Sequence, residues 1–175
     1  DVDVLTHEFG HSLQGFLGGD NIPAYRNPGM ECCEMHSMSM EYLTYPWMNL
    51  FFKEDTEKYL YQHLADAITF IPYGCIVDAF QAYVYENPDL THKERKAYFR
   101  ELEKTYLPHK NYAGNEFLES GGFFMKQSHI FELPFYYLDY TIAQVVSLEF
   151  FSMSEKDHQG TFEKYLDFCS RSIYL

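Results

Sequence analysis

The sequence predicts a mainly α fold, and three observations lead to that prediction. Apolar residues recur at helical spacing along most of the 175 residues. No run of alternating apolar and polar residues stands out as a strand, and the Asn-Gly and Asp-Gly pairs that favour hairpins are absent. Because 46% of the residues are hydrophobic, the chain can bury a core. We therefore expect one multi-helical domain over residues 1–175.

The first helix is expected to end at Gly18-Gly19, since paired glycines commonly stop a helix. Its apolar stripe consists of Phe9, Leu13 and Phe16, which we expect to be buried. Glycines, prolines and an Asp-Asn pair then predict a loop over residues 18–29.

Six further helices follow, with ends marked by prolines, glycines and capping residues. Thr91 and Glu94 form a capping box, and Gly121-Gly122 suggest a mobile joint before residues 123–140. The first of these helices is expected over residues 30–52, with a kink at Pro46. The second starts at residue 55 or 56 and ends just before Pro72. The other four are expected over residues 72–86, 91–107, 134–153 and from 161 to the end.

The net charge of the chain limits the classes of partner that it can bind. Thirteen Lys and Arg against 26 Asp and Glu leave a net charge of −13, which repels phosphate backbones and anionic lipid surfaces. No apolar run approaches the roughly 18 residues of a membrane span. The four cysteines form no C-x-x-C pair and are expected to be reduced thiols. We therefore expect a cytoplasmic protein that binds neither nucleic acid nor membrane.

A metal-binding pattern stands in the first helix, as His7-Glu8-Phe9-Gly10-His11. Residues four apart lie on one face of a helix, so the two imidazoles can reach one zinc ion. Glu8 sits at the edge of that face, where it can accept a proton from an attacking water. The alternative to a metal site is an amphipathic helix on which His7 and His11 are ordinary surface residues. Both histidines lie off the apolar stripe of that helix.

The third ligand is not chosen by spacing alone. Gln14 and Leu17 stand where the H-E-x-x-H-x-x-G-x-x-H class needs Gly and His, so that class is excluded. A carboxylate from the next helix remains, and Glu34 and Glu41 share a face because they are seven residues apart. That arrangement suits one ligand and one acceptor that holds a zinc-bound imidazole. Glu31 and His36 are further candidates for the third ligand. Asp3 either orients the His7 imidazole or is simply an acid near the helix N-terminus that the helix dipole stabilises.

The other histidines lie in polar contexts and are predicted to face solvent. This set comprises His63, His92, His109 and His158. His36 is expected to be a surface residue or to lie just outside the ligand set.

Two segments together resemble the M3 family of zinc metallopeptidases, and the oligoendopeptidase F branch in particular, which is related to thimet oligopeptidase. They are residues 6–12, around the two histidines, and the block Glu34-x-x-Ser37-x-x-x-Glu41. The resemblance implies a gluzincin-type site in which Glu34 is the third zinc ligand and Glu8 is the general base. It also implies that Gly10 allows a close approach to bound peptide.

A third segment adds to the resemblance. It runs over residues 128–140 and contains His129, Tyr136, Tyr137 and Tyr140. In the family such His and Tyr side chains bind the substrate backbone and the oxyanion, and a Tyr hydroxyl stays protonated at neutral pH. The alternative for the three tyrosines is a place in the hydrophobic core.

The resemblance implies a zinc-dependent endopeptidase that hydrolyses short oligopeptides with one Zn²⁺ per chain. Family enzymes are longer and carry an N-terminal helical half that encloses the substrate. We therefore expect a catalytic portion truncated at both ends, part of a larger all-helical enzyme. The alternative is a zinc-binding helical module that is inactive by itself because the enclosing half is missing.

Overall fold

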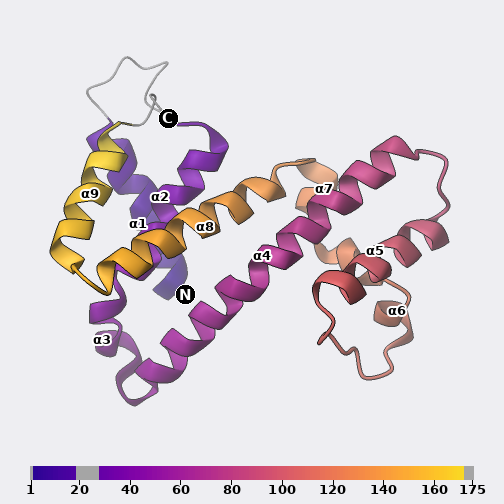
Figure 1. The fold of residues 1–175 in the computed structure, drawn as a ribbon, viewed down its shortest axis with the longest axis horizontal. Coiled ribbons are helices and arrows are strands. Elements are labelled where there is room, and N and C mark those ends of the chain that lie inside the picture. Colours follow the sequence, from indigo (N-terminus) through magenta and orange to yellow (C-terminus); the bar gives the residue numbers. More distant parts are fainter. Residues whose placement is uncertain (1, 19–27, 172–175) are drawn as a thin grey trace. The chain divides into compact units, whose positions relative to one another are not determined.

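The computed structural model describes residues 2–18 and 28–171, without the side chains of Met30 and Glu31, and these residues form helices and turns but no strand (Figure 1). The mainly α prediction is confirmed. The elements are α1 (Val2–Leu17), α2 (Met30–Leu43), η2 (Tyr45–Trp47), α3 (Asn49–Phe52), η3 (Lys53–Asp55), α4 (Thr56–Glu86), α5 (His92–Tyr106), α6 (Glu116–Glu119), η4 (Gly122–Lys126), α7 (His129–Glu132), α8 (Tyr137–Ser154) and α9 (His158–Ser170).

The chain divides into two compact units, and each has its own core. Unit 1 comprises Asp1–Ala65 and Ile142–Leu175, and unit 2 comprises Asp66–Thr141. The chain passes between them twice, once within α4 and once within α8. That residues 1–175 make one catalytic domain stays a prediction.

Unit 1 is built on the contact between α1 and α2, with α9 packed against both. Its core cluster consists of Met40, Leu43, Tyr165 and Cys169. The buried Tyr165 hydroxyl donates a hydrogen bond of 2.9 Å to the backbone oxygen of His36, so this phenol has a partner inside the core.

The predicted apolar stripe of α1 is wrong for Phe9 and Phe16, whereas Leu13 is partly buried and packs against the core cluster of unit 1. Phe9 is 54% exposed and Phe16 is 81% exposed, whereas Gly10 and Gln14 are buried. The reason is the distance between the helices. A Cβ atom on Gly10 would lie 2.6 Å from Cα of Ser37, so α1 approaches α2 with its smallest residue rather than with its aromatic side chains.

The second predicted helix is shorter than expected. Helix α2 ends at Leu43, and the N–H of Thr44 closes its last turn by bonding to the oxygen of Met40. Pro46 lies in the first turn of η2 instead of kinking a longer helix. A proline there loses no helical hydrogen bond, whereas inside a continuing helix it would.

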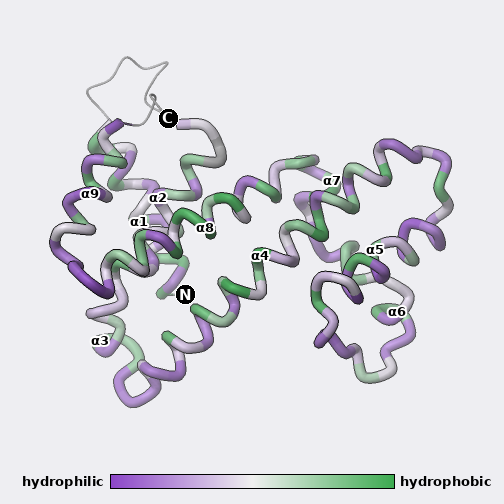
Figure 2. Tube along the Cα trace, in the orientation of Figure 1, coloured by the Kyte–Doolittle hydropathy of each residue, from purple (hydrophilic) through white to green (hydrophobic). Residues whose placement is uncertain are grey.

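The two helices predicted on either side of Pro72 are a single helix, α4. Proline inside a helix costs about 3 kcal/mol, so packing must offset that cost. Ile76, Val77 and Phe80, all at most 2% exposed, provide it. Figure 2 shows hydrophobic stretches recurring along α4. Contrary to the sequence expectation, one window within Asn49–Glu86 is long and apolar enough to cross a membrane, and 33% of it is buried. A single helix of this kind does not by itself indicate a membrane span, since core helices of other proteins meet the same criterion.

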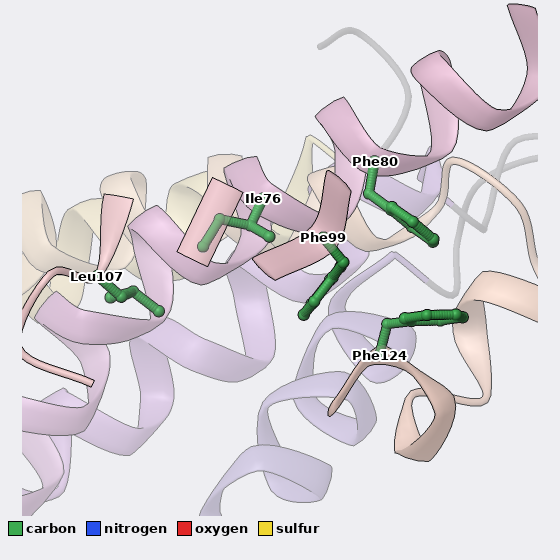
Figure 3. Packing of buried hydrophobic residues seen from close by; sticks show 5 residues of the cluster. All are labelled: Ile76, Phe80, Phe99, Leu107 and Phe124. Carbon is green, nitrogen blue, oxygen red and sulfur yellow. The ribbon is translucent and has the colours of Figure 1, made fainter. Parts of the chain in front are cut away.

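Unit 2 has an aromatic core, drawn in Figure 3. The Phe80 ring packs edge-on to Phe99, at 5.2 Å between centroids, and lies 4.6 Å from Phe124. The predicted capping box at the start of α5 is confirmed. The Thr91 hydroxyl accepts from the N–H of Glu94, and the Glu94 carboxylate accepts from the N–H of Thr91.

The glycine pair before residue 123 is not a free joint. Gly121 has φ +91° and a Cβ on it would collide with the backbone oxygen of Lys96, while a Cβ on Gly122 would meet the Phe117 ring at 2.5 Å. Both glycines are buried. They serve a close packing contact, so the prediction of a mobile joint is wrong.

The last two predicted helices start elsewhere. Helix α8 begins at Tyr137, three residues after Pro134, because Phe135 has a positive φ of 66° that a helix does not allow. Helix α9 begins at His158, where Asp157 is the N-cap and accepts a hydrogen bond from the N–H of Gly160.

We predict that Gly10→Ala destabilises the protein by about 1–3 kcal/mol, because the added methyl group forces α1 away from the backbone of α2. Gly15→Ala is the matched control on the same helix, since nothing lies within 4 Å of its Cβ position. The control should be neutral or up to about 1 kcal/mol more stable. Urea unfolding of both variants measures the difference, and equal stability of the two would contradict the packing argument.

Candidate functional site

The two motif histidines and one carboxylate converge in unit 1. The half-buried rings of His7 and His11 lie 5.0 Å apart, nearly perpendicular to each other. Oε2 of the buried Glu34 is 3.3 Å from Nε2 of His7 and 3.7 Å from Nε2 of His11. One donor atom from each residue lies within 4.8 Å of the other two.

This donor set fits a zinc ion. At bond lengths of about 2.0–2.2 Å, two ligands of a tetrahedral zinc lie about 3.3–3.6 Å apart. The two distances from Glu34 to the imidazoles are close to that spacing. Two imidazoles and one carboxylate are also a donor set of catalytic zinc sites, which leave a fourth position open. His7, His11 and Glu34 can therefore hold the metal.

One imidazole of the site holds its proton unusually firmly. Burial disfavours a charged imidazole, but hydrogen bonds to Glu34 and Glu41 outweigh it and raise the pKa of His7 to about 9. For His11 burial prevails and the pKa is lowered, with a smaller contribution from the charge of His7. One imidazole is thus protonated and the other neutral near pH 7.

Glu41 links the site to residues that the sequence did not indicate. The Nδ1–H of His7 donates to Oε1 of Glu41 at 2.7 Å, and the Nε2–H of His63 donates to Oε2 at 2.7 Å. The hydroxyl of Tyr45 donates to Nδ1 of His63 at 2.6 Å. Burial tends to raise the pKa of Glu41, but the two imidazoles outweigh it and lower it.

The prediction that His63 faces solvent is therefore wrong. Its side chain is 15% exposed and both of its ring nitrogens are hydrogen-bonded. His158 is also half-buried, with Nε2 donating to the backbone oxygen of Leu43 at 2.8 Å, whereas His92 and His109 are exposed as predicted. The helical pattern around His63 holds no signal for this role, because the acid it contacts lies on another helix.

The remaining ligand atoms have partners as well. Nδ1 of His11 lies 3.4 Å from the sulfur of Cys33, whose pKa is raised by burial so that it stays a thiol. The buried Ser37 hydroxyl lies 3.2 Å from Oε2 of Glu34 and 3.0 Å from its backbone oxygen, and can donate to either. Such contacts orient metal ligands and limit their rotation.

Glu8 borders a cavity beside the triad. The cavity has a volume of about 290 Å³ and is lined by Asp3, Val4, His7, Glu8 and Glu41. The Glu8 side chain is exposed and so can exchange protons with water. Asp3 lines the same cavity. Both ring nitrogens of His7 contact other carboxylates, those of Glu34 and Glu41, so the role of Asp3 in orienting His7 stays a prediction.

Three other candidates have different outcomes. His36 is fully buried, with its ring 4.4 Å from that of Phe168, and burial lowers its pKa to about 4, so the surface prediction is wrong. Gly10 faces α2, which gives it a packing role instead of the peptide contact that we predicted. The side chain of Glu31 lies outside the described residues.

The second group of predicted site residues comes together in unit 2. The His129 ring lies 5.2 Å from Tyr137, 5.7 Å from Tyr140 and 6.2 Å from Tyr136. Tyr137 is buried, which raises its pKa to about 12, and the other three are partly exposed. Tyr137 therefore keeps its proton at neutral pH and can donate a hydrogen bond.

His129 has a defined tautomer. The side-chain amide of Gln127 donates to its Nδ1 at 2.7 Å, so the ring proton is on Nε2. The hydroxyl of Tyr73 in turn donates to the amide oxygen of Gln127 at 3.2 Å. His129 is thus held as a donor through Nε2.

The chain is similar to known peptidases. The sequence pattern of peptidase family M3 matches residues 1–168. PZ peptidase A with an inhibitor is 50% identical, with a TM-score of 0.94 over 98% of this chain and 31% of that one. The same values hold for a provisionally assigned oligoendopeptidase F. A second such protein, from Bacillus anthracis str. Ames, is 43% identical and has a TM-score of 0.82. That match covers 98% of this chain and 28% of the other. No curated protein matches.

We predict that Glu41→Gln weakens zinc binding by roughly 10- to 100-fold, because the amide cannot accept full-strength hydrogen bonds from both imidazoles. Competition with a chelator of known affinity measures the change. Glu8→Gln is the control, because Glu8 borders the same cavity without belonging to the ligand set. Equal zinc affinities of Glu41→Gln and the wild type would show that Glu41 does not support the site.

We also predict that zinc binding depends on pH. His7 must lose the proton that its raised pKa of about 9 retains, so zinc affinity should rise roughly tenfold per pH unit from about pH 7 to 9. Calorimetry in two buffers of different ionisation enthalpy should find about one proton released per zinc at pH 7. An affinity that does not change over this range would mean that His7 is already neutral.

Proposed function

Because this chain belongs to peptidase family M3, we propose that it forms the zinc-binding catalytic part of a metalloendopeptidase that cleaves short oligopeptides. One observation carries the proposal. A single carboxylate oxygen of Glu34 lies 3.3 Å and 3.7 Å from Nε2 of the two motif imidazoles, close to the spacing of two ligands on one zinc ion.

Each protein group has a distinct task in this proposal. When bound, zinc lowers the pKa of water and polarises the scissile carbonyl. Glu8 takes up the proton of the attacking water and delivers it to the leaving amine. Its exposed carboxylate beside the cavity supports that role. Glu41 holds the His7 ring in the tautomer that leaves Nε2 for the metal.

The unit 2 residues bind the peptide in this proposal. Tyr140, together with Tyr137, and the Nε2–H of His129 donate to the oxyanion that forms at the scissile carbonyl, and Tyr136 contacts the substrate backbone. Their support is the cluster of four rings and the fixed tautomer of His129. Donors that are already oriented need no reorganisation as charge develops.

The proposal concerns the whole enzyme that contains this chain. The chain spans 28% to 31% of the length of the solved structures it matches. We propose that the remaining part encloses the peptide and limits substrates to short chains. The four cysteines are thiols rather than disulfides, which fits the cytoplasmic location that we propose. They are Cys32, Cys33, Cys75 and Cys169.

We predict that Glu8→Gln keeps stoichiometric zinc but lowers kcat for peptide cleavage by several orders of magnitude. Glutamine is nearly isosteric with glutamate and cannot act as a base. The full-length enzyme should be assayed on a quenched fluorescent oligopeptide, with zinc content measured in parallel. His11→Ala is the contrasting variant and should lose both zinc and activity. Near-normal cleavage by Glu8→Gln would remove Glu8 from its proposed role.

A further inference from the structure

Unit 2 contains a cavity for which the proposed function names no ligand. Its volume is about 460 Å³, and aromatic rings form much of its wall, among them Phe70, Tyr73 and Phe123. Two lysines, Lys110 and Lys126, also line it. The combination of apolar rings and cations is unusual in a chain of net charge −13.

The two lysines converge on one ring. Nζ of Lys110 lies 3.5 Å from the centroid of Phe123, and Nζ of Lys126 lies 4.3 Å from the same centroid. Like charges at such proximity repel each other. Burial lowers the pKa of Lys110, and the charges of Lys126 and Arg100 add to that effect, partly opposed by Glu103. An anion beside the ring would relieve this repulsion.

The protein neutralises only one of these cations by a close ion pair. Lys110 is 3.1 Å from the fully buried carboxylate of Glu103, which also receives bonds from Arg100 and Tyr112. Within the part of the chain that the structure describes, no carboxylate lies within 4.0 Å of the exposed Lys126. The other titratable groups on the cavity wall are Asp66, Tyr73, His109 and Tyr137.

The cavity adjoins the residues proposed to bind the peptide. Gln127 lines it and donates to His129, and Tyr73 lines it and donates to Gln127. Tyr137 forms another part of the wall, with its ring 5.2 Å from that of His129. A peptide held by His129 would therefore have a neighbouring group within reach of the cavity.

We propose that this cavity is a specificity subsite that binds a carboxylate of the peptide substrate, with Lys126 as its ion-pair partner and Phe123 and Tyr73 packed on the adjoining methylene groups. The inference rests on the proposed function. A cationic side chain would face two lysines, and a purely apolar one would remove Lys126 from water without a partner. A carboxylate avoids both costs, because it forms a charge-assisted hydrogen bond with the Lys126 ammonium.

The carboxylate can come from an acidic side chain or from the peptide's C-terminus, and paired substrates distinguish the two. One pair has Glu or Gln at a single position beside the scissile bond, with an amidated C-terminus. The other pair has a free or an amidated C-terminus and no acidic residue. With the zinc-loaded full-length enzyme, we expect the carboxylate member of one pair to be preferred roughly tenfold in kcat/KM.

Lys126 is the residue to change, because removing Lys110 would leave the buried Glu103 without its ion pair. Lys126→Met should reduce the preference to near unity, and Lys126→Arg should retain most of it. Lys93→Met is the matched control, since Lys93 is an exposed lysine of the same unit that does not line the cavity. This control should leave the preference unchanged.

A binding measurement keeps this inference separate from the proposed function. Zinc-loaded Glu8→Gln enzyme can be titrated calorimetrically with the preferred peptide and its amide partner, without turnover. Tighter binding of the carboxylate peptide that is lost in a Glu8→Gln, Lys126→Met double variant supports the subsite. Equal kcat/KM within both substrate pairs would overturn it. Failure to cleave any peptide while the binding preference persists would instead reject the proposed function.

Discussion

The backbone contact between α1 and α2 at Gly10 is the constraint on which the candidate metal site depends. Without a Cβ at this position, α1 comes close enough to the backbone of Ser37 for the buried Glu34 to reach both His7 and His11. The contact leaves the aromatic side chains of α1 exposed, although burying them would contribute more hydrophobic free energy. Helix α1 therefore packs on α2 through Gly10 rather than through Phe9 and Phe16.

Partnered polar groups extend from that contact into unit 1. A half-buried carboxylate such as Glu41 is costly unless hydrogen-bonded, and it receives one bond from His7 and one from His63. Tyr45 completes the series by bonding the second nitrogen of His63. The His7 imidazole is therefore held at Nδ1 by a carboxylate that His63 fixes in turn, which limits the side-chain entropy lost when an ion binds at Nε2.

In unit 2 a series of hydrogen bonds likewise fixes one imidazole, that of His129. Gln127 sets the tautomer of His129 and is itself held by Tyr73 on the wall of the lysine-containing cavity. The group proposed to bind the peptide and the proposed carboxylate subsite thus share one hydrogen-bonded series.

The sequence by itself determined the helical class, the capping box at Thr91 and the pair of imidazoles, because each depends on residues within one or two helical turns. Spacing could not choose among the acids of α2 or reveal His63, since those choices depend on which helix faces which. Local rules likewise stopped a helix at Pro72, where buried contacts carry α4 through. Tertiary packing decided these points because its energies come from residues distant in sequence, which periodicity does not encode.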